Sequence, residues 1–215
     1  MTSPHVWFFD LDGTLYDPRA GLWPAVGARI EAFLQRFLGL DAPAARALRR
    51  RYVQQYGTTL RGLMEEHPQV DPHAYLDFVA QVPVEAFVRP DPRLRALLAQ
   101  LPGPKWVFTN GDAPYARRVL RALKVDDAFD GIIDIVQLNF VGKPWPEAYE
   151  HALQLARAPR QQALLVDDVR ANVDAARAAG WQAVWVHPEA PAPRAGEIPH
   201  IYALLQGLPK QERQR

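Results

Sequence analysis

The sequence HVWFFDLDGTLYDP, residues 5–18, joins a short apolar run to two acidic residues. Residues 6–9 are continuously apolar and mostly aromatic, which is typical of a strand buried on both faces. Ligands of open parallel sheets bind at the carboxyl ends of the strands, and Asp10 stands at such an end. Residues two apart in an extended chain point to the same side, so we predict that Asp10 and Asp12 face one site. Two carboxylates that face one point repel each other, and a bound cation would relieve that repulsion.

Apolar runs of the same kind recur along the chain. They stand at residues 105–109, 131–136, 163–167 and 183–187. Apolar residues at helical spacing lie between the later runs, and strands that alternate with helices imply a parallel sheet covered on both faces. We therefore predict an α/β fold with a Rossmann-like parallel sheet.

One long stretch breaks this alternation, because residues 16–89 contain helical patterns and no strand pattern. We predict a discontinuous α/β core made of residues 1–15 and 90–215, interrupted by an all-helical domain at residues 16–89. Residues 187–199 are expected to form a proline-rich loop, and residues 209–215 a frayed, flexible tail.

The composition narrows the classes of function. The net charge is +1, so no global field attracts a nucleic acid polymer or a membrane surface. The chain has no cysteine, which excludes disulfides and thiolate metal sites. No apolar run approaches the ~20 residues needed to span a bilayer, and the first residues show no signal-peptide pattern. We expect a cytoplasmic protein, monomeric or homodimeric, without membrane or nucleic acid partners.

Polar residues follow three of the later predicted strands. Thr109 and Asn110 follow the second in FTNG, Lys143 lies in GKP after the third, and Asp167 and Asp168 end the fourth in LVDD. Acids, a hydroxyl and an ammonium group at one sheet edge are the parts that phosphoryl transfer needs. Hard oxygen ligands favour Mg²⁺ as the cation. Each residue alone also has an ordinary interpretation, as a loop cap, an Asx turn or a solvated charge.

Four motifs in order resemble the haloacid dehalogenase (HAD) superfamily of phosphohydrolases. They are DLDGTLY (10–16), FTNG (108–111), GKP (142–144) and LVDDVRANVDAARAAG (165–180). The helical insertion after the first strand matches the cap domain of the subclass I members. Within that cap, YVQQYGTTLRGL (52–63), together with RPDPRL (89–94), resembles the pyrimidine 5'-nucleotidase branch of the superfamily.

The resemblance implies roles for the residues at the strand ends. Asp10 would attack phosphorus and form an aspartyl-phosphate, while Asp12 would protonate the leaving oxygen and later activate water. Thr109, Asn110 and Lys143 would bind the phosphate.

The resemblance also implies a Mg²⁺ site. The ligands would be Asp10, the backbone carbonyl of Asp12, and Asp168, with Asp167 behind them or bound through water. The adjacent acids leave the choice between Asp167 and Asp168 open. The dehalogenases of the superfamily generally lack an acid at the position of Asp12, so Asp12 favours phosphate chemistry.

The cap would select the leaving group. Five residues form a polar and aromatic cluster there: Tyr52, Tyr56, Thr58, Thr59 and Arg61. A nucleobase could stack on a tyrosine while a threonine or the arginine reads its edge. Alternatively, the two tyrosines pack the helices of the cap and the arginine is a surface charge.

The expected activity is that of a Mg²⁺-dependent phosphatase acting on a small phosphorylated metabolite, preferably a pyrimidine nucleoside 5'-monophosphate. Small sugar or organic phosphates are the alternative substrates. A phospho-receiver signalling module is an alternative from another class. Receivers, however, carry their paired acids on the first strand and have no helical cap after it, whereas Asp167 and Asp168 come late in this chain.

Overall fold

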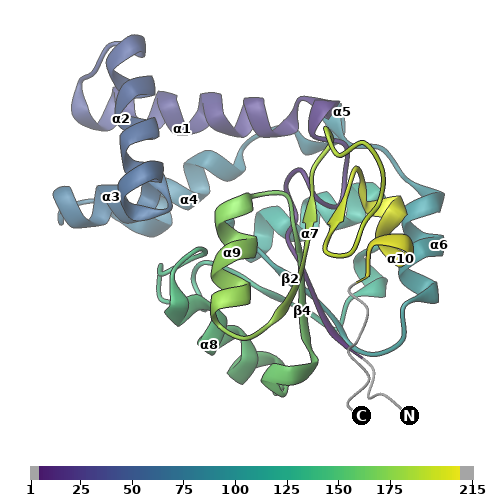
Figure 1. Ribbon diagram of the computed structural model, residues 1–215. Helices are drawn as coiled ribbons and strands as arrows, with labels where there is room; N and C mark the ends of the chain where they lie inside the picture. The colour runs from purple at the N-terminus through teal and green to yellow at the C-terminus, as the bar shows by residue number, and fades with distance from the viewer. Residues whose placement is uncertain (1–4, 209–215) are drawn as a thin grey trace.

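A parallel sheet of six strands forms the centre of the computed structural model, which describes residues 5–208 (Figure 1). The strands are β1 (Val6–Phe9), β2 (Lys105–Phe108), β3 (Gly131–Ile133), β4 (Ala163–Asp167), β5 (Gln182–Val186) and β6 (Glu197–Ile198). Their order across the sheet is β3-β2-β1-β4-β5-β6, so β1 pairs with both β2 and β4. The predicted α/β fold with a parallel sheet is confirmed.

Two details of the sheet differ from the prediction. β3 ends before Asp134, because the carboxylate of Asp134 accepts hydrogen bonds from the backbone N–H groups of Gln137 (2.9 Å) and Ala113 (2.8 Å) and turns the chain. The predicted loop at residues 187–199 contains the short strand β6. This strand satisfies backbone groups along the edge of β5 that would otherwise lack partners.

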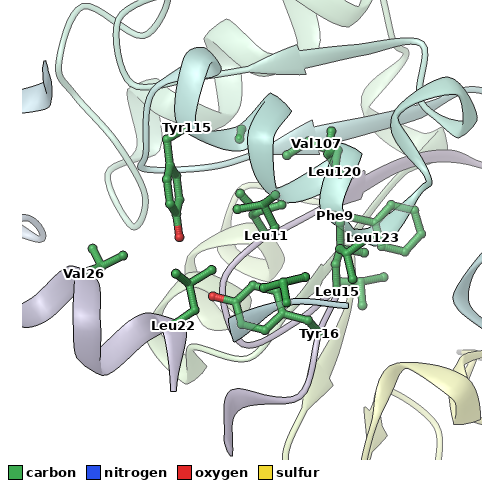
Figure 2. Close-up of a cluster of buried hydrophobic side chains, with 14 of the residues drawn as sticks. Phe9, Leu11, Leu15, Tyr16, Leu22, Val26, Val107, Tyr115, Leu120 and Leu123 are labelled. Carbon is green, nitrogen blue, oxygen red and sulfur yellow. The ribbon is translucent and has the colours of Figure 1, made fainter. Parts of the chain in front are cut away.

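Helices cover both faces of the sheet. Those of the core are α6 (Pro92–Gln100), α7 (Ala113–Leu123), α8 (Pro146–Ala156), α9 (Arg170–Ala178) and α10 (Leu204–Gly207), with short 3₁₀ turns at Asp126–Ala128, Arg160–Gln162 and Ile201–Ala203. Phe8 packs in a cluster with α8 and α9, and Phe9 packs on the other face with α6 and α7. Figure 2 shows Phe9 beside Leu120 and Leu123 of α7. Burial on both faces explains why β1 is apolar at every position.

The helical insertion lies between β1 and α6. It consists of a 3₁₀ turn at Pro18–Ala20 and helices α1 (Leu22–Leu38), α2 (Ala42–Tyr56), α3 (Thr59–Glu66), α4 (Pro72–Ala80) and α5 (Val84–Phe87). Figure 1 shows α1 to α4 extending away from the sheet. Buried residues recur every four positions along α1, from Leu22 through Val26 and Ile30 to Leu34, and give the insertion its own apolar seam. We propose that these helices form the cap domain predicted for residues 16–89.

The core and the insertion are joined by polar contacts. Arg118 of α7 donates hydrogen bonds to the backbone carbonyls of Ala80 (2.8 Å), the last residue of α4, and of Val82 (3.0 Å) just after it. Within residues 5–208, no helix is both long and apolar enough to cross a membrane. The tail predicted at residues 209–215 lies outside the described residues. The cytoplasmic location and the monomeric or homodimeric state stay predictions.

Candidate active site

A cavity of about 720 Å³ lies between the carboxyl ends of the strands and the helices of the insertion. Among the predicted core residues, six line it: Asp10, Asp12, Thr109, Asn110, Lys143 and Asp168. Three of them, Asp10, Thr109 and Asp168, directly follow β1, β2 and β4. They lie close together because neighbouring parallel strands end at the same edge. The residues predicted from the four motifs thus lie together in one place.

Lys143 is the charged centre of this site. Its ammonium group is fully buried and donates hydrogen bonds to Asp10 Oδ1 (2.8 Å) and Asp167 Oδ2 (2.6 Å). Burial alone would lower the pKa of Lys143, but the two carboxylates hold it above its usual range. Lys143 therefore stays protonated and neutralises part of the acidic cluster.

Asn110 fixes the loop that carries Lys143. Its Nδ2 donates to the carbonyl of Lys143 (2.8 Å), and its Oδ1 accepts from the N–H of Lys143 (2.8 Å). Gly142 makes this approach possible, since a Cβ there would lie 2.4 Å from Asn110 Oδ1. The amide of Asn110 thus positions Lys143, and the predicted contact of Asn110 with phosphate stays a prediction for its backbone N–H.

Thr109 presents its hydroxyl at the end of β2. Its Oγ1 accepts a hydrogen bond from the N–H of Gly111 (3.0 Å), and the side chain lies on the cavity wall. Because a hydroxyl can accept and donate at once, the proton of Thr109 stays available for an anion in the cavity.

The acidic cluster fits a divalent cation. One carboxylate oxygen from each of Asp10, Asp167 and Asp168 lies within 4.8 Å of the other two. Burial raises the pKa of Asp10 well above its ordinary value; Lys143 opposes this rise, and Asp167 and Asp168 add to it. Burial, followed by the charge of Asp167, raises the pKa of Asp168 to about 6. One lysine therefore does not balance the cluster, and hard oxygen donors at this spacing suit Mg²⁺.

The two adjacent acids have different surroundings. Asp167 is fully buried, and its two oxygens accept hydrogen bonds from Lys143 Nζ, the N–H of Val169 (2.8 Å) and Nδ2 of Asn172 (3.0 and 3.1 Å). Asp168 lies on the cavity wall and is held through Thr14, whose hydroxyl is 3.2 Å from Asp168 Oδ1. The oxygens of Asp168 are the more available of the two sets.

Two tyrosines that the sequence analysis did not identify hold Asp12. The hydroxyls of Tyr16 and Tyr115 each donate to Asp12 Oδ1 at 2.6 Å. Figure 2 shows the two side chains with their hydroxyl ends turned toward one another. Burial raises the pKa of Asp12, and the tyrosine hydrogen bonds act against that rise. Tyr16 follows the DLDGTL motif directly, whereas Tyr115 comes from α7 and has no signal in the sequence around Asp12.

Of the five predicted cap residues, two line the cavity and three contact other cap residues. Thr58 and Thr59 line the cavity. Tyr52 is fully buried, and its hydroxyl donates to Glu66, as does that of Tyr56 (3.1 and 3.2 Å). Arg61 pairs with Glu65 one helical turn away. Tyr52, Tyr56 and Arg61 thus contact other cap residues and do not line the cavity, which favours the alternative of packing and surface charge over contact with the substrate.

Comparison with known proteins places the chain in a family. Residues 5–180 match the model of the haloacid dehalogenase-like hydrolases, and the chain belongs to that family.

Its curated relatives include Phosphate metabolism protein 8 of Saccharomyces cerevisiae, 31% identical over 81% of this chain and 59% of the yeast protein. Phosphoglycolate phosphatase of Pseudomonas savastanoi pv. phaseolicola is 28% identical over 82% of this chain and 67% of the bacterial protein. The chain thus spans only part of the relatives it matches.

Solved structures share the fold. The HAD-hydrolase YfnB from Bacillus subtilis, bound to magnesium, matches with a TM-score of 0.60 at 16% identity, over 95% of this chain and 98% of that one. L-2-haloacid dehalogenase from Xanthobacter autotrophicus matches with a TM-score of 0.56 at 18% identity, over 88% and 80%.

Proposed function

We propose that this protein is a Mg²⁺-dependent phosphomonoesterase that works through an aspartyl-phosphate on Asp10. The observation that carries the proposal is the buried contact of the Lys143 ammonium with Asp10, with Asp12 two residues further on the same cavity wall. The phosphatase name of a curated relative supports the same class of reaction. Dehalogenases share the fold, but the acid at Asp12 favours phosphate chemistry.

In the first half of the reaction, a carboxylate oxygen of Asp10 attacks phosphorus while the bond from phosphorus to the leaving oxygen breaks. Asp12, whose raised pKa favours the protonated form, gives its proton to that leaving oxygen and frees the alcohol. In the second half, Asp12 takes a proton from water, the water oxygen attacks phosphorus, and Asp10 is released. Lys143 and the hydroxyl of Thr109 stabilise the charge on the phosphoryl oxygens.

The residues that would hold Mg²⁺ are Asp10, Asp168 and the backbone carbonyl of Asp12, with Asp167 behind them. The hydrogen bonds already made by both oxygens of Asp167 support Asp168 as the direct ligand. Bound there, the ion would offset the charge shared by the phosphate and the carboxylates.

The finer hypothesis, a pyrimidine nucleoside 5'-monophosphate as substrate, has less support than the reaction class. Of the five cap residues on which it rests, only Thr58 and Thr59 line the cavity. Thr58 already accepts a hydrogen bond from the N–H of Arg61 (3.1 Å) as the N-cap of α3. UMP and CMP therefore belong in a substrate panel beside sugar and organic phosphates.

Removal of the metal tests the proposal. Phosphate release from this panel is expected to need Mg²⁺, because without the ion Lys143 alone offsets the charge of the acidic cluster. The rate should fall to background in EDTA and recover when excess Mg²⁺ is added back. Phosphate release that continues unchanged in EDTA would contradict the metal site. Binding of the phosphate ester without turnover in Mg²⁺ would contradict the phosphatase activity.

Tyr115→Phe is expected to lower kcat about tenfold, because Asp12 loses one of the two hydroxyls that orient it. The hydrogen bond lowers the pKa of Asp12, so its loss should raise that pKa and move the Asp12-dependent limb of the pH–rate profile to higher pH. The measurement is kcat against pH. Tyr202→Phe is the matched control, since the hydroxyl of Tyr202 donates to Asp91 away from the cavity. A Tyr115→Phe profile that keeps the wild-type shape would assign Tyr115 a packing role only.

A further inference from the structure

We infer that the leaving-group end of the cavity is built for an apolar alcohol, so that the preferred substrates are phosphate monoesters of alkyl, prenyl or aryl alcohols. This inference rests on the proposed phosphatase function and assigns its substrate class. Four observations carry it.

The first observation is where the exposed apolar side chains lie. Among the described residues, six large apolar side chains are exposed, and four of these line the cavity. They are Trp23, Val53, Trp145 and Val169, with exposed fractions of 46, 48, 42 and 47%. Exposed apolar groups that gather around one opening mark a binding surface, whereas scattered ones need no explanation. Leu155 and Leu205, the other two, do not line the cavity.

The second observation is the composition of the deeper wall. Val26 and Ile30 of α1, Leu60 of α3, and Leu76 and Val79 of α4 all line the cavity. Three cap helices thus turn apolar side chains toward the same space, although each also contributes to the seam inside the cap. An alcohol without polar groups would bury its surface there at a favourable free energy.

The third observation is that the described part of the cap wall offers no unpaired charge. Among the described cap residues that line the cavity, Arg49 is the only charged one, and it pairs with Glu31 (3.2 Å). The other described polar side chains of this wall, such as Gln54 and Thr58, are neutral. Facing the cap from the core, Trp145 donates its indole N–H to the carbonyl of Tyr56 (2.8 Å), so its ring remains as apolar surface. A leaving group that carries its own charge, such as the carboxylate of phosphoglycolate, would find no unpaired cation on this wall.

The fourth observation is the division of the cavity into two ends. Lys143, Asp10 and Asp168 line the cavity from the strand ends, and Trp23, Val53 and the deeper apolar wall line it from the cap helices. Trp145 and Val169 add apolar surface from the core loops beside Lys143 and Asp168. A volume of about 720 Å³ is within the range of about 300–1,000 Å³ that holds a medium-sized ligand. The phosphate of an amphipathic monoester would meet the charged end, and its hydrocarbon part would meet the cap.

A series of n-alkyl phosphates tests the inference, from ethyl through butyl and hexyl to octyl phosphate, each kept below its critical micelle concentration. UMP and glycerol 3-phosphate are measured beside them with Mg²⁺. We expect kcat/KM to rise about threefold for each added methylene until the chain fills the cap side, and to be higher for octyl phosphate than for UMP or glycerol 3-phosphate.

Trp23→Gln should lower the ratio of kcat/KM for octyl phosphate to that for ethyl phosphate about tenfold. Leu155→Gln is the matched control, because it removes an apolar side chain of similar exposure (40%) away from the cavity and should leave the ratio unchanged. Thermal unfolding of both variants confirms that they are folded.

The outcomes separate the two proposals. Absence of phosphate release from every ester would overturn the phosphatase function itself. Turnover that does not depend on chain length, or a preference for UMP, would overturn the apolar substrate class and leave the phosphatase standing. An equal loss for all esters in Trp23→Gln would assign Trp23 to closure of the cap and would also count against the inference.

Discussion

Asp10→Asn should lower kcat for every phosphate ester by at least about 10⁴-fold, because an amide oxygen is a poor nucleophile and cannot form the acyl phosphate. Asparagine has nearly the shape of aspartate and keeps an oxygen for the Lys143 ammonium, so the fold should be retained. The measurement is phosphate release at saturating substrate and Mg²⁺, with thermal unfolding as the check on folding.

Asp174→Asn is the matched control for this substitution. Asp174 lies on the exposed face of α9, paired with Arg170, and does not line the cavity. Its replacement should leave kcat within about twofold of the wild-type value, as expected for surface changes. An Asp10→Asn protein that is folded and retains a tenth of the wild-type kcat would rule out Asp10 as the nucleophile.

Lys143→Met should have the second largest effect, and it should act on both activity and stability. The phosphoryl oxygens lose a buried cation, so kcat should fall about 10²- to 10³-fold. Two buried carboxylates also lose their common partner, which should lower the free energy of unfolding by about 3–5 kcal/mol at neutral pH. Activity and denaturant unfolding measure the two effects separately.

The stability loss of Lys143→Met should depend on pH in a defined direction. Burial already raises the pKa of Asp10, and the charge of Lys143 counteracts this rise. Removal of Lys143 should therefore raise the pKa of Asp10 further. A carboxylate with a raised pKa in the folded state contributes its stability below its unfolded pKa of about 3.9 and loses it as the pH rises through the folded pKa. The difference from wild type should therefore be small near pH 4 and largest at neutral pH.

Lys105→Met is the control for this series, because Lys105 stands at the opposite end of β2 from Thr109 and does not line the cavity. It should change neither kcat nor the pH dependence of stability. A Lys143→Met deficit that is the same at pH 4 and pH 7 would show that lost packing, rather than unpaired charge, explains the destabilisation.

The core of the candidate site could be predicted from the sequence for a simple geometric reason. Asp10, Thr109 and Asp167 each end or follow a strand, and neighbouring parallel strands end at one edge. The apolar runs and the helical patterns between them were enough to place that edge. Lys143 follows β3 by a longer loop, and the order of the motifs placed it in the same site.

The rest depends on packing between distant segments. Tyr115 reaches Asp12 only because α7 packs beside the chain that leaves β1, and no local pattern around either residue records this. Adjacent cap residues can also have different surroundings that the sequence does not distinguish. Tyr52 and Val53 are neighbours on α2, yet one is buried inside the cap and the other lines the cavity. Helical spacing identifies an apolar face but does not say whether another helix or a ligand covers it.

The central claim is that Asp10 forms a covalent phosphoryl intermediate, and trapping that intermediate tests it most directly. The wild-type protein is mixed with Mg²⁺ and a phosphate ester that it hydrolyses, quenched in acid within one turnover, and treated with borohydride, which reduces an aspartyl-phosphate to homoserine. Peptide mass spectrometry then locates the modified residue. We predict homoserine at position 10 in wild-type protein and none in Asp10→Asn. Phosphate release on the same time course without any homoserine at position 10 would contradict the account.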